Sequence, residues 1–236
     1  MPYLTAYNIK LIAITAMLID HIAWSFVDLE NMTGQIMHLF GRITAPIMCF
    51  FIVQGFIHTK SLIRYLHRLI IFAVISQLPY SYFRFGTIAL LPFNMIYTLA
   101  LGLLVIYSFC YIHNEFWRIA AILIIIAFSL LGDWMYLAIA FCLVFYIYCH
   151  SFTKQAFAIA AIAVLEVIGL FFNELALGKD IISAWLNSGF QLGILLSLPL
   201  IYLYNGNQGG FKYSRWLFYI FYPAHLLILG IIKALV

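Results

Sequence analysis

Long apolar runs, separated by short polar stretches, dominate the chain from end to end. Most runs are long enough, or nearly so, for a helix that crosses a hydrocarbon core of about 30 Å. The pattern predicts an all-α, polytopic integral membrane helix bundle with about nine transmembrane helices. We expect these helices at residues 9–27, 36–58, 64–83, 93–112, 117–131, 134–150, 155–173, 187–204 and 215–233.

The boundary between the fifth and sixth expected helices depends on the turn at Gly132, Asp133 and Trp134. If this turn lay inside one re-entrant element, the bundle would have one helix fewer. Two short helices fit better, because a single helix of about 33 residues would overshoot the bilayer. We interpret residues 1–236 as one integral membrane domain. Asp20 and His21 interrupt the first apolar run, so we expect a retained anchor rather than a signal peptide.

Composition agrees with a membrane protein, because 66% of the 236 residues are apolar and 8% are charged. A soluble globular domain carries charge on about a quarter of its residues, so that class is excluded. The net charge of +4 is small, and we expect membrane lipid but no nucleic acid among the partners. The cysteines lack metal-ligand spacing, so we expect no metal and interpret them as small buried hydrophobes. They are Cys49, Cys110, Cys142 and Cys149.

The distribution of lysine and arginine predicts the orientation of the helices. A cytoplasmic N-terminus places most basic residues on the cytoplasmic side and five acidic residues on the opposite side. The basic residues are Lys10, Lys60, Arg64, Arg68, Arg118, Lys154, Lys212 and Arg215. The acidic residues are Asp28, Glu30, Asp133, Glu174 and Asp180. This bias is consistent with a cytoplasmic N-terminus and an odd number of helices.

Ionisable residues inside the first apolar run are the strongest indication of chemistry, because charge within a membrane is costly. Lys10 and His21 stand eleven positions apart. In an α-helix that spacing is three turns plus about 20°, so both side chains share one face and lie about 16 Å apart along the axis. Asp20 stands beside His21, and Arg42 and His225 are expected at a related depth. A cytoplasmic basic ring is expected below them, formed by Lys10, Lys60, Arg64, His67 and Arg68.

These two layers indicate acyl transfer. A basic ring can hold a phosphate-rich carrier, and a buried histidine oriented by a carboxylate can act as a general base. Coenzyme A fits this geometry, because its phosphates can stay at the ring while its pantetheine arm carries a thioester into the bundle. An acceptor amine or hydroxyl would then meet the thioester near His21.

Each residue also has a structural interpretation. His21 could be a packing histidine, and Asp20 could pair with Arg42 to fix the packing of the first two helices. The basic ring could be a topology signal alone. His225 could satisfy a backbone carbonyl left without a donor by Pro223.

Several segments resemble TraX-type proteins, in the order expected along the family. They are residues 10–22, 41–46, 54–59, 64–68, 76–79, 94–102 and 204–226, and together they extend over nearly the whole chain. The last segment, which ends in Phe221-Tyr222-Pro223-Ala224-His225-Leu226, is the most telling. The ordered sum of these motifs is more specific than any one of them.

The resemblance implies an inner-membrane acyltransferase related to the acyltransferase-3 group. The family's namesake acetylates the N-terminal amine of conjugative pilin. By this resemblance, acetyl-CoA is the donor substrate, Lys10 contacts it, and His21 is catalytic. Lysine stands where arginine is common, which keeps the charge but loses the bidentate fork. Arg42 and His225 match other family positions.

The sequence leaves open whether the acceptor is a protein or a glycan. It also leaves open whether transfer passes through a covalent acyl-histidine or occurs directly. A different class of function is a non-enzymatic membrane assembly factor or a proton-coupled small-solute transporter. In that case Glu166, Asp20 and the histidines would form a proton path.

Overall fold

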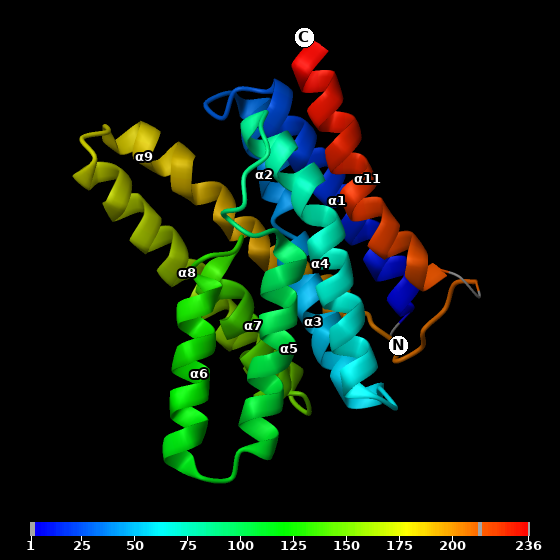
Figure 1. Cartoon of the computed structure of the whole chain (residues 1–236). Coiled ribbons are helices and arrows are strands. Elements are labelled where there is room, and N and C mark those ends of the chain that lie inside the picture. Colours follow the sequence, from blue (N-terminus) through cyan, green and yellow to red (C-terminus); the bar gives the residue numbers. More distant parts are fainter. Residues whose placement is uncertain (1–2, 212–213, 236) are drawn as a thin grey trace. The chain divides into compact units, whose positions relative to one another are not determined.

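The computed structural model describes residues 3–211 and 214–235, so Lys212 of the expected basic set lies outside the described residues. The described chain is helical with two isolated bridges and no strand, which confirms the all-α prediction. The elements are α1 (Ala6–Phe26), α2 (Met32–Gly41), α3 (Thr44–His58), α4 (Leu62–Phe85), α5 (Met95–Tyr111), α6 (Glu115–Ser129), α7 (Met135–Ile147), α8 (Phe152–Ala176), α9 (Ile181–Ser188), the 3₁₀ helix η1 (Gly189–Leu196), α10 (Ser197–Tyr202) and α11 (Ser214–Leu235) (Figure 1).

Six helical stretches of the described chain are long and apolar enough to cross a membrane, which indicates a membrane protein. They are Ala6–Phe26, Met32–His58, Leu62–Phe85, Phe152–Ala176, Ile181–Tyr202 and Trp216–Leu235. The helices α5, α6 and α7 are shorter, with 17, 15 and 13 residues. Nine crossings and a cytoplasmic N-terminus therefore stay predictions.

The expected single helix at 36–58 is wrong in one respect, because α2 ends at Gly41 and α3 begins at Thr44. Pro46 explains the break. Within a continuous helix its nitrogen would have to donate to the Arg42 carbonyl, and proline has no N–H. In the structure Pro46 lies in the first turn of α3, where an N–H needs no helical partner.

The turn between α6 and α7 confirms the two-helix interpretation of this region. The backbone of Phe93 pairs with the turn on both sides of Gly132: its N–H donates to the Leu131 carbonyl at 2.8 Å, and its carbonyl accepts from the Asp133 N–H at 2.8 Å. Trp134 and Met135 adopt positive φ angles of 60° and 33°, a left-handed conformation in which the chain enters α7.

The expected helix at 187–204 starts earlier, at Ile181, and it is not α-helical throughout. The 3₁₀ helix η1 forms its middle, and it packs against α2. A Cβ atom on Gly193 would lie 1.9 Å from the Leu39 carbonyl oxygen, so only glycine allows the two backbones to approach this closely.

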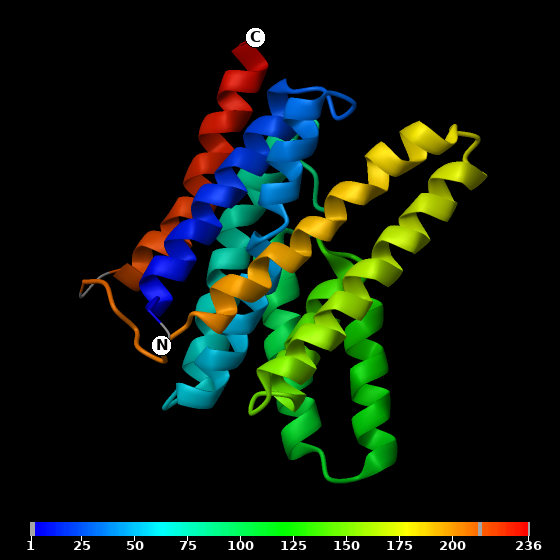
Figure 2. The ribbon, with the colours of Figure 1, turned by 180° about the vertical axis from the view of Figure 1, so that it is seen from behind.

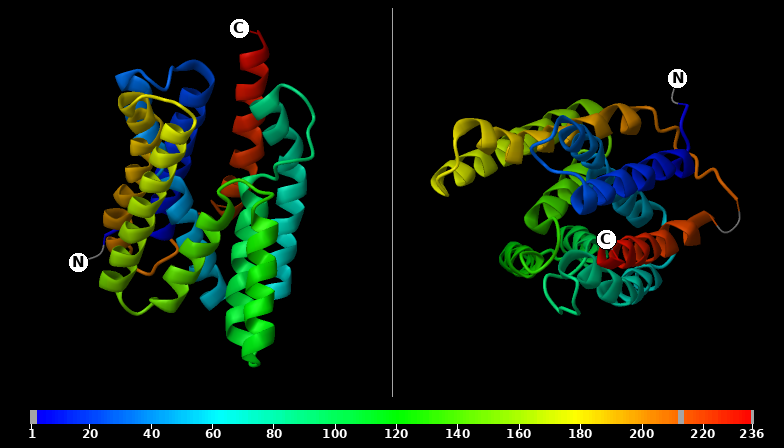
Figure 3. Two further views of the ribbon diagram at one scale, coloured as in Figure 1. Left: turned by 90° about the vertical axis from the view of Figure 1, so that its left-hand side faces the viewer. Right: turned by 90° about the horizontal axis from the view of Figure 1, so that it is seen from above.

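The described helices form two compact units, each drawn from both halves of the sequence. The first unit is Met1–Ile47 with Ser151–Ser214, and in it α8 runs antiparallel to α9 and η1 (Figure 2). The second unit is Met48–His150 with Arg215–Val236, and in it α4, α6 and α7 pack on α5. Phe72 of α4 stacks on Tyr219 of α11 with ring centroids 4.7 Å apart, and the two helices lie side by side (Figure 3). The single-domain interpretation stays a prediction.

The N-terminal end of α1 is held by a distant segment of the same unit. The N–H groups of Ala6 and Tyr7 donate to the carbonyls of Asn207 and Gln208 at 2.8 and 2.9 Å. The Thr5 side chain accepts from the Asn8 N–H as an N-cap. The backbone donors at the start of α1 are therefore satisfied by the chain itself.

Candidate functional site

One carboxylate lies on the buried face of α1. The buried positions Ile9, Ala13, Ala16, Asp20 and Ala23 recur every three or four residues, which places them on one side of the helix. This side includes small residues and faces α2. Asp20 is therefore presented to α2 inside the first unit rather than to the surroundings.

Two side chains from the end of α2 bind the Asp20 carboxylate. The His38 Nδ1 lies 2.8 Å from Oδ1, and the Arg42 Nη2 donates to Oδ2 at 2.5 Å. His38 and Arg42 are four residues apart, so both project from the same face of the helix end. We call Asp20, His38 and Arg42 the Asp20 triad. It contains the Asp20–Arg42 pair that the sequence offered as a structural interpretation of Asp20.

The triad is buried and its charges balance. Asp20, His38 and Arg42 have exposed fractions of 7%, 0% and 8%. An isolated carboxylate at such a place would be very costly, and the Arg42 guanidinium compensates it. An ionised carboxylate only accepts hydrogen bonds, so Nδ1 of His38 carries the hydrogen. In the neutral ring, Nε2 then bears the lone pair.

The second ring nitrogen of His38, Nε2, makes no hydrogen bond. His38 Nε2 is buried and has no hydrogen-bond partner. The indole of Trp24 packs against the imidazole with ring centroids 4.3 Å apart, and the Phe190 ring of η1 lies 5.4 Å away. The Arg42 guanidinium lies over the same Phe190 ring at 5.4 Å. Two aromatic rings thus pack on the imidazole, and its buried Nε2 keeps a lone pair that can accept a proton.

Lys10 and His21 lie in the same unbroken helix, α1, as expected. Both side chains are half-buried, and the two residues between them on this face, Ile14 and Met17, are buried. The Lys10–His21 face is thus adjacent to the Asp20 face around the helix. Asp20 itself is bound by His38 and Arg42, so it is not reserved for His21.

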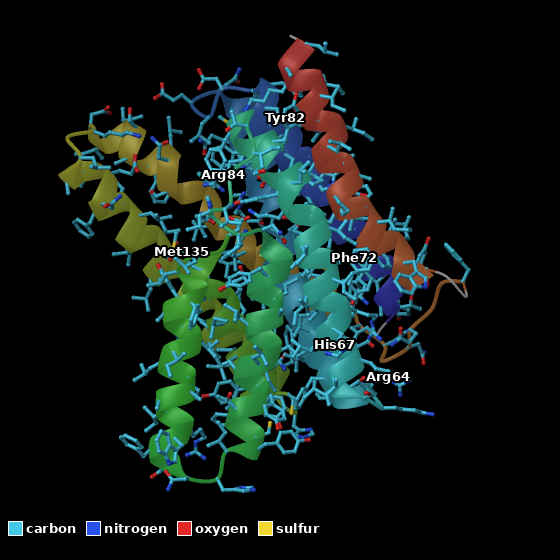
Figure 4. The ribbon with its side chains drawn as sticks, viewed as in Figure 1. Arg64, His67, Phe72, Tyr82, Arg84 and Met135 are labelled. Carbon is cyan, nitrogen blue, oxygen red and sulfur yellow. The ribbon has the colours of Figure 1, made fainter. Side chains whose placement is uncertain are left out.

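The remaining expected basic residues lie at the start of α4 in the second unit. Lys60 and Arg64 are exposed, and Figure 4 shows Arg64 and His67 at the N-terminal end of α4. The Arg68 guanidinium lies over the Tyr65 ring at 5.3 Å. These side chains can attract an anion by charge, and the basic ring that would join them to Lys10 stays a prediction.

His225 lies on α11 of the second unit, buried to an exposed fraction of 5%. Its Nδ1 donates to the Phe221 carbonyl at 2.8 Å, and its ring stacks on the Phe221 ring with centroids 4.7 Å apart. The hydrogen bond to the preceding turn fixes the orientation of the ring.

A second polar cluster of the same unit lies at the other end of α4. Arg84, labelled in Figure 4, donates to the Tyr80 hydroxyl at 3.0 Å, and its guanidinium lies 3.7 Å from the Asp133 carboxylate. The Arg84 side chain is half exposed, so this pair resembles an ordinary interfacial ion pair. Within residues 3–211 and 214–235, no group of three His, Cys, Asp or Glu side chains could hold a metal ion, and all four cysteines are free thiols.

Sequence reasoning missed His38. It lies in the apolar run Ile36-Met37-His38-Leu39-Phe40, where a lone histidine resembles a packing residue. One signal was present: His38 precedes Arg42 by four residues, so a helix would place the two side chains together beside whatever carboxylate Arg42 bound.

Comparisons with known proteins agree along almost the whole chain. The model of the family described as "TraX protein" matches residues 6–233. A relative from Dichelobacter nodosus, described as "Probable fimbrial assembly protein FimC, serogroup H1", is 33% identical over 237 residues. The alignment covers 95% of this chain and 94% of the relative. No solved structure matches the chain.

Proposed function

Because the chain belongs to the TraX family, we propose that it is a pilus-related membrane acyltransferase that moves an acetyl group from acetyl-CoA to an amine or hydroxyl of an exported acceptor. The observation that carries the proposal is the buried Asp20 triad, whose carboxylate lies on the apolar helix α1 that also bears Lys10 and His21. Ionisable groups inside a membrane are expensive, so an ordered cluster of them is more typical of chemistry than of packing.

The pilus association of the acceptor comes from the relative's description as a fimbrial assembly protein. The favoured acceptor is a pilin N-terminal amine, and a glycan hydroxyl is the second choice. The site lies in the inner membrane in this proposal, with the N-terminus in the cytoplasm so that Lys10 meets a cytoplasmic donor. Nine crossings and a relationship to the acyltransferase-3 group belong to the same proposal.

The reaction requires three roles from the chain. A basic side chain attracts the phosphates of acetyl-CoA, for which Lys10 is the candidate in the first unit and Lys60, Arg64 and Arg68 are the candidates in the second. An imidazole takes a proton from the acceptor, for which His21 is the candidate from the sequence. A cationic or N–H donor, for which Arg42 and His225 are the candidates, stabilises the oxyanion that forms at the thioester carbonyl. Direct transfer needs no more than these roles.

The donor half of the proposal is tested by binding. The purified protein, in mild detergent, should unfold at a higher temperature when acetyl-CoA is added, because a ligand of the native state stabilises it. Lys10→Ala should shift this stabilisation to higher acetyl-CoA concentrations, whereas Lys10→Arg should retain it. An acetyl-CoA dependence of the Lys10→Ala protein equal to that of the unmodified protein would contradict the role of Lys10.

The transfer half is tested by release of the CoA thiol from acetyl-CoA in the presence of a synthetic peptide with a free N-terminal amine. His21→Ala should abolish release if His21 takes part in the chemistry. A protein that neither binds acetyl-CoA nor releases the thiol refutes the acyltransferase.

One other function has an observation in its favour. The relative is described as an assembly protein, which fits a non-enzymatic factor that only holds pilus subunits in the membrane. That function requires no acyl-CoA binding, so the same stabilisation measurement separates the two. A proton-coupled transporter, with half-buried Glu166 of α8 on the path, makes the same negative prediction for acetyl-CoA.

A further inference from the structure

We propose that His38, rather than His21, is the group that takes the proton from the acceptor. The inference rests on the proposed acyltransferase and assigns one role within it. It also names the chemistry of the acceptor at this site: a primary amine carried by an apolar segment.

The imidazole of His38 is held in the orientation that a general base requires. A histidine that acts as a general base needs one ring nitrogen held as N–H so that the other keeps its lone pair. Asp20 provides that hold for His38 through the 2.8 Å contact at Nδ1. The other Asp20 oxygen is bound by Arg42 at 2.5 Å, so the carboxylate that was expected to orient His21 serves His38 instead.

The Nε2 atom of His38 is buried without a hydrogen-bond partner. His38 has an exposed fraction of 0%, and its Nε2 has no hydrogen-bond partner. A buried polar atom without a partner costs roughly 1–3 kcal/mol. A histidine kept for packing alone would retain this cost without return, whereas an N–H of a substrate amine would satisfy Nε2 directly.

The aromatic side chains next to His38 favour an apolar acceptor with an uncharged amine. Trp24 packs on the His38 ring and has an exposed fraction of 47%, so one side-chain contact connects the buried imidazole to the surface of the unit. Phe190 lies against the imidazole on η1. Burial away from water disfavours a charged ammonium group, so an amine that enters this site is held in its neutral, nucleophilic form. An apolar chain segment bearing the amine would be compatible with the same surroundings.

Transfer of the acetyl group to the amine conserves all atoms and charges. The amine nitrogen attacks the thioester carbonyl carbon of acetyl-CoA, and a new C–N bond forms. The amine loses a proton to Nε2 of His38, the C–S bond breaks, and the proton then passes to the departing CoA thiolate to give the thiol. While His38 is protonated, the Asp20 carboxylate lies between two cations, His38 and Arg42, and stabilises both.

The test uses substitutions to asparagine in the full-length protein. His38→Asn retains an N–H close to the position of Nδ1, so it can still donate to Asp20, but it lacks Nε2. His21→Asn is the matched comparison, and His113→Asn, at an exposed histidine of the α5–α6 loop, is the control. Release of the CoA thiol is measured with acetyl-CoA and a synthetic apolar peptide that has a free N-terminal amine.

We expect His38→Asn to slow thiol release by at least about 100-fold, the lower end for loss of a general base. Stabilisation of this variant by acetyl-CoA should be unchanged, because donor binding is separate from Nε2. Imidazole in solution should partly restore thiol release by a His38→Gly variant. His113→Asn should match the unmodified protein.

The inference is overturned if His38→Asn releases thiol at a rate within about threefold of the unmodified protein while His21→Asn loses turnover. If His38→Asn does not fold, the folded His21→Asn protein decides alone: retained turnover supports His38, and lost turnover with retained acetyl-CoA stabilisation refutes it. Failure of the acyltransferase itself has a different result, since the unmodified protein would then show neither stabilisation nor thiol release.

Discussion

Replacement of Gly41 by alanine tests whether the close approach of α1 and α2 positions the Asp20 triad. A Cβ atom at this position would lie 2.3 Å from Asp20 Cβ and 2.4 Å from its Cγ and Oδ1, whereas ordinary contact begins at 3.4 Å. The nearest neighbour is the Cβ of another helix, so rotation of a flexible chain end cannot relieve the clash. Asp20 and Gly41 must therefore move apart.

The required movement follows from the two distances. The difference between 3.4 and 2.3 Å is 1.1 Å, so the helices must separate by about that amount. If the movement falls along the 2.8 Å contact between Asp20 and His38, that contact grows to nearly 4 Å and is lost. A hydrogen bond to a charged group contributes about 1.5–3 kcal/mol, and we expect Gly41→Ala to lower the free energy of unfolding by an amount in this range.

The measurement is a denaturant titration in mild detergent, followed by circular dichroism. Gly169→Ala is the matched control, because a Cβ at Gly169 meets nothing within 4 Å on α8. This control should be neutral or gain up to about 1 kcal/mol from helix propensity. Equal free energies of unfolding for the two variants would show that the α1–α2 approach does not depend on the absence of a side chain at Gly41.

Two further predictions concern charge. Asp20→Asn keeps the shape of the side chain but leaves the Arg42 charge buried without its counter-ion, so the free energy of unfolding should fall by about 3–5 kcal/mol in the same titration. A loss below about 1 kcal/mol, the value of an exposed pair, would contradict burial of the triad. A hydrogen bond from the Ser183 side chain and bonds from backbone N–H groups hold the pKa of Asp180 below its ordinary value. A lowered pKa gives stability that is present above the ordinary range and is lost as pH falls through the lowered value. Protection of the Ile182 and Ser183 amides from hydrogen exchange, taken relative to the intrinsic exchange rate at each pH, should therefore stay high at neutral pH and fall only in strong acid, and Asp180→Asn should remove this fall.

The sequence was sufficient where one periodic pattern determined the result. The apolar run at 9–27 predicted a continuous first helix that carries both Lys10 and His21, and α1 runs unbroken from Ala6 to Phe26. The separation of α6 from α7 also followed from the sequence, because Gly132-Asp133 interrupts a run too long for one helix. These are local features, and local rules are the strongest part of sequence reasoning.

Features that depend on contacts between distant segments could not be predicted in the same way. Hydropathy alone favoured one helix at 36–58, although Pro46 in the sequence indicated where it could break. Arg42 was offered by the sequence as a partner of Asp20, but the second partner depended on which face of α2 meets α1, and that is decided by packing at Gly41 rather than by spacing. His38 was missed for this reason. The eight-residue 3₁₀ segment η1 likewise reflects the close passage of Gly193 over Leu39, a long-range contact.

The hydrogen bonds from Ala6 and Tyr7 to the carbonyls of Asn207 and Gln208 have a consequence for how a phosphorylated carrier could be recognised. A helix that begins with unoccupied amides can grip an anion through its main chain, largely independent of which side chains are nearby. Here those amides are already occupied, so a phosphate beside Lys10 meets an ammonium group and little else from this helix end. Binding of the phosphate at this helix end should therefore weaken steeply as salt is added, because it would depend on the positive charge of Lys10.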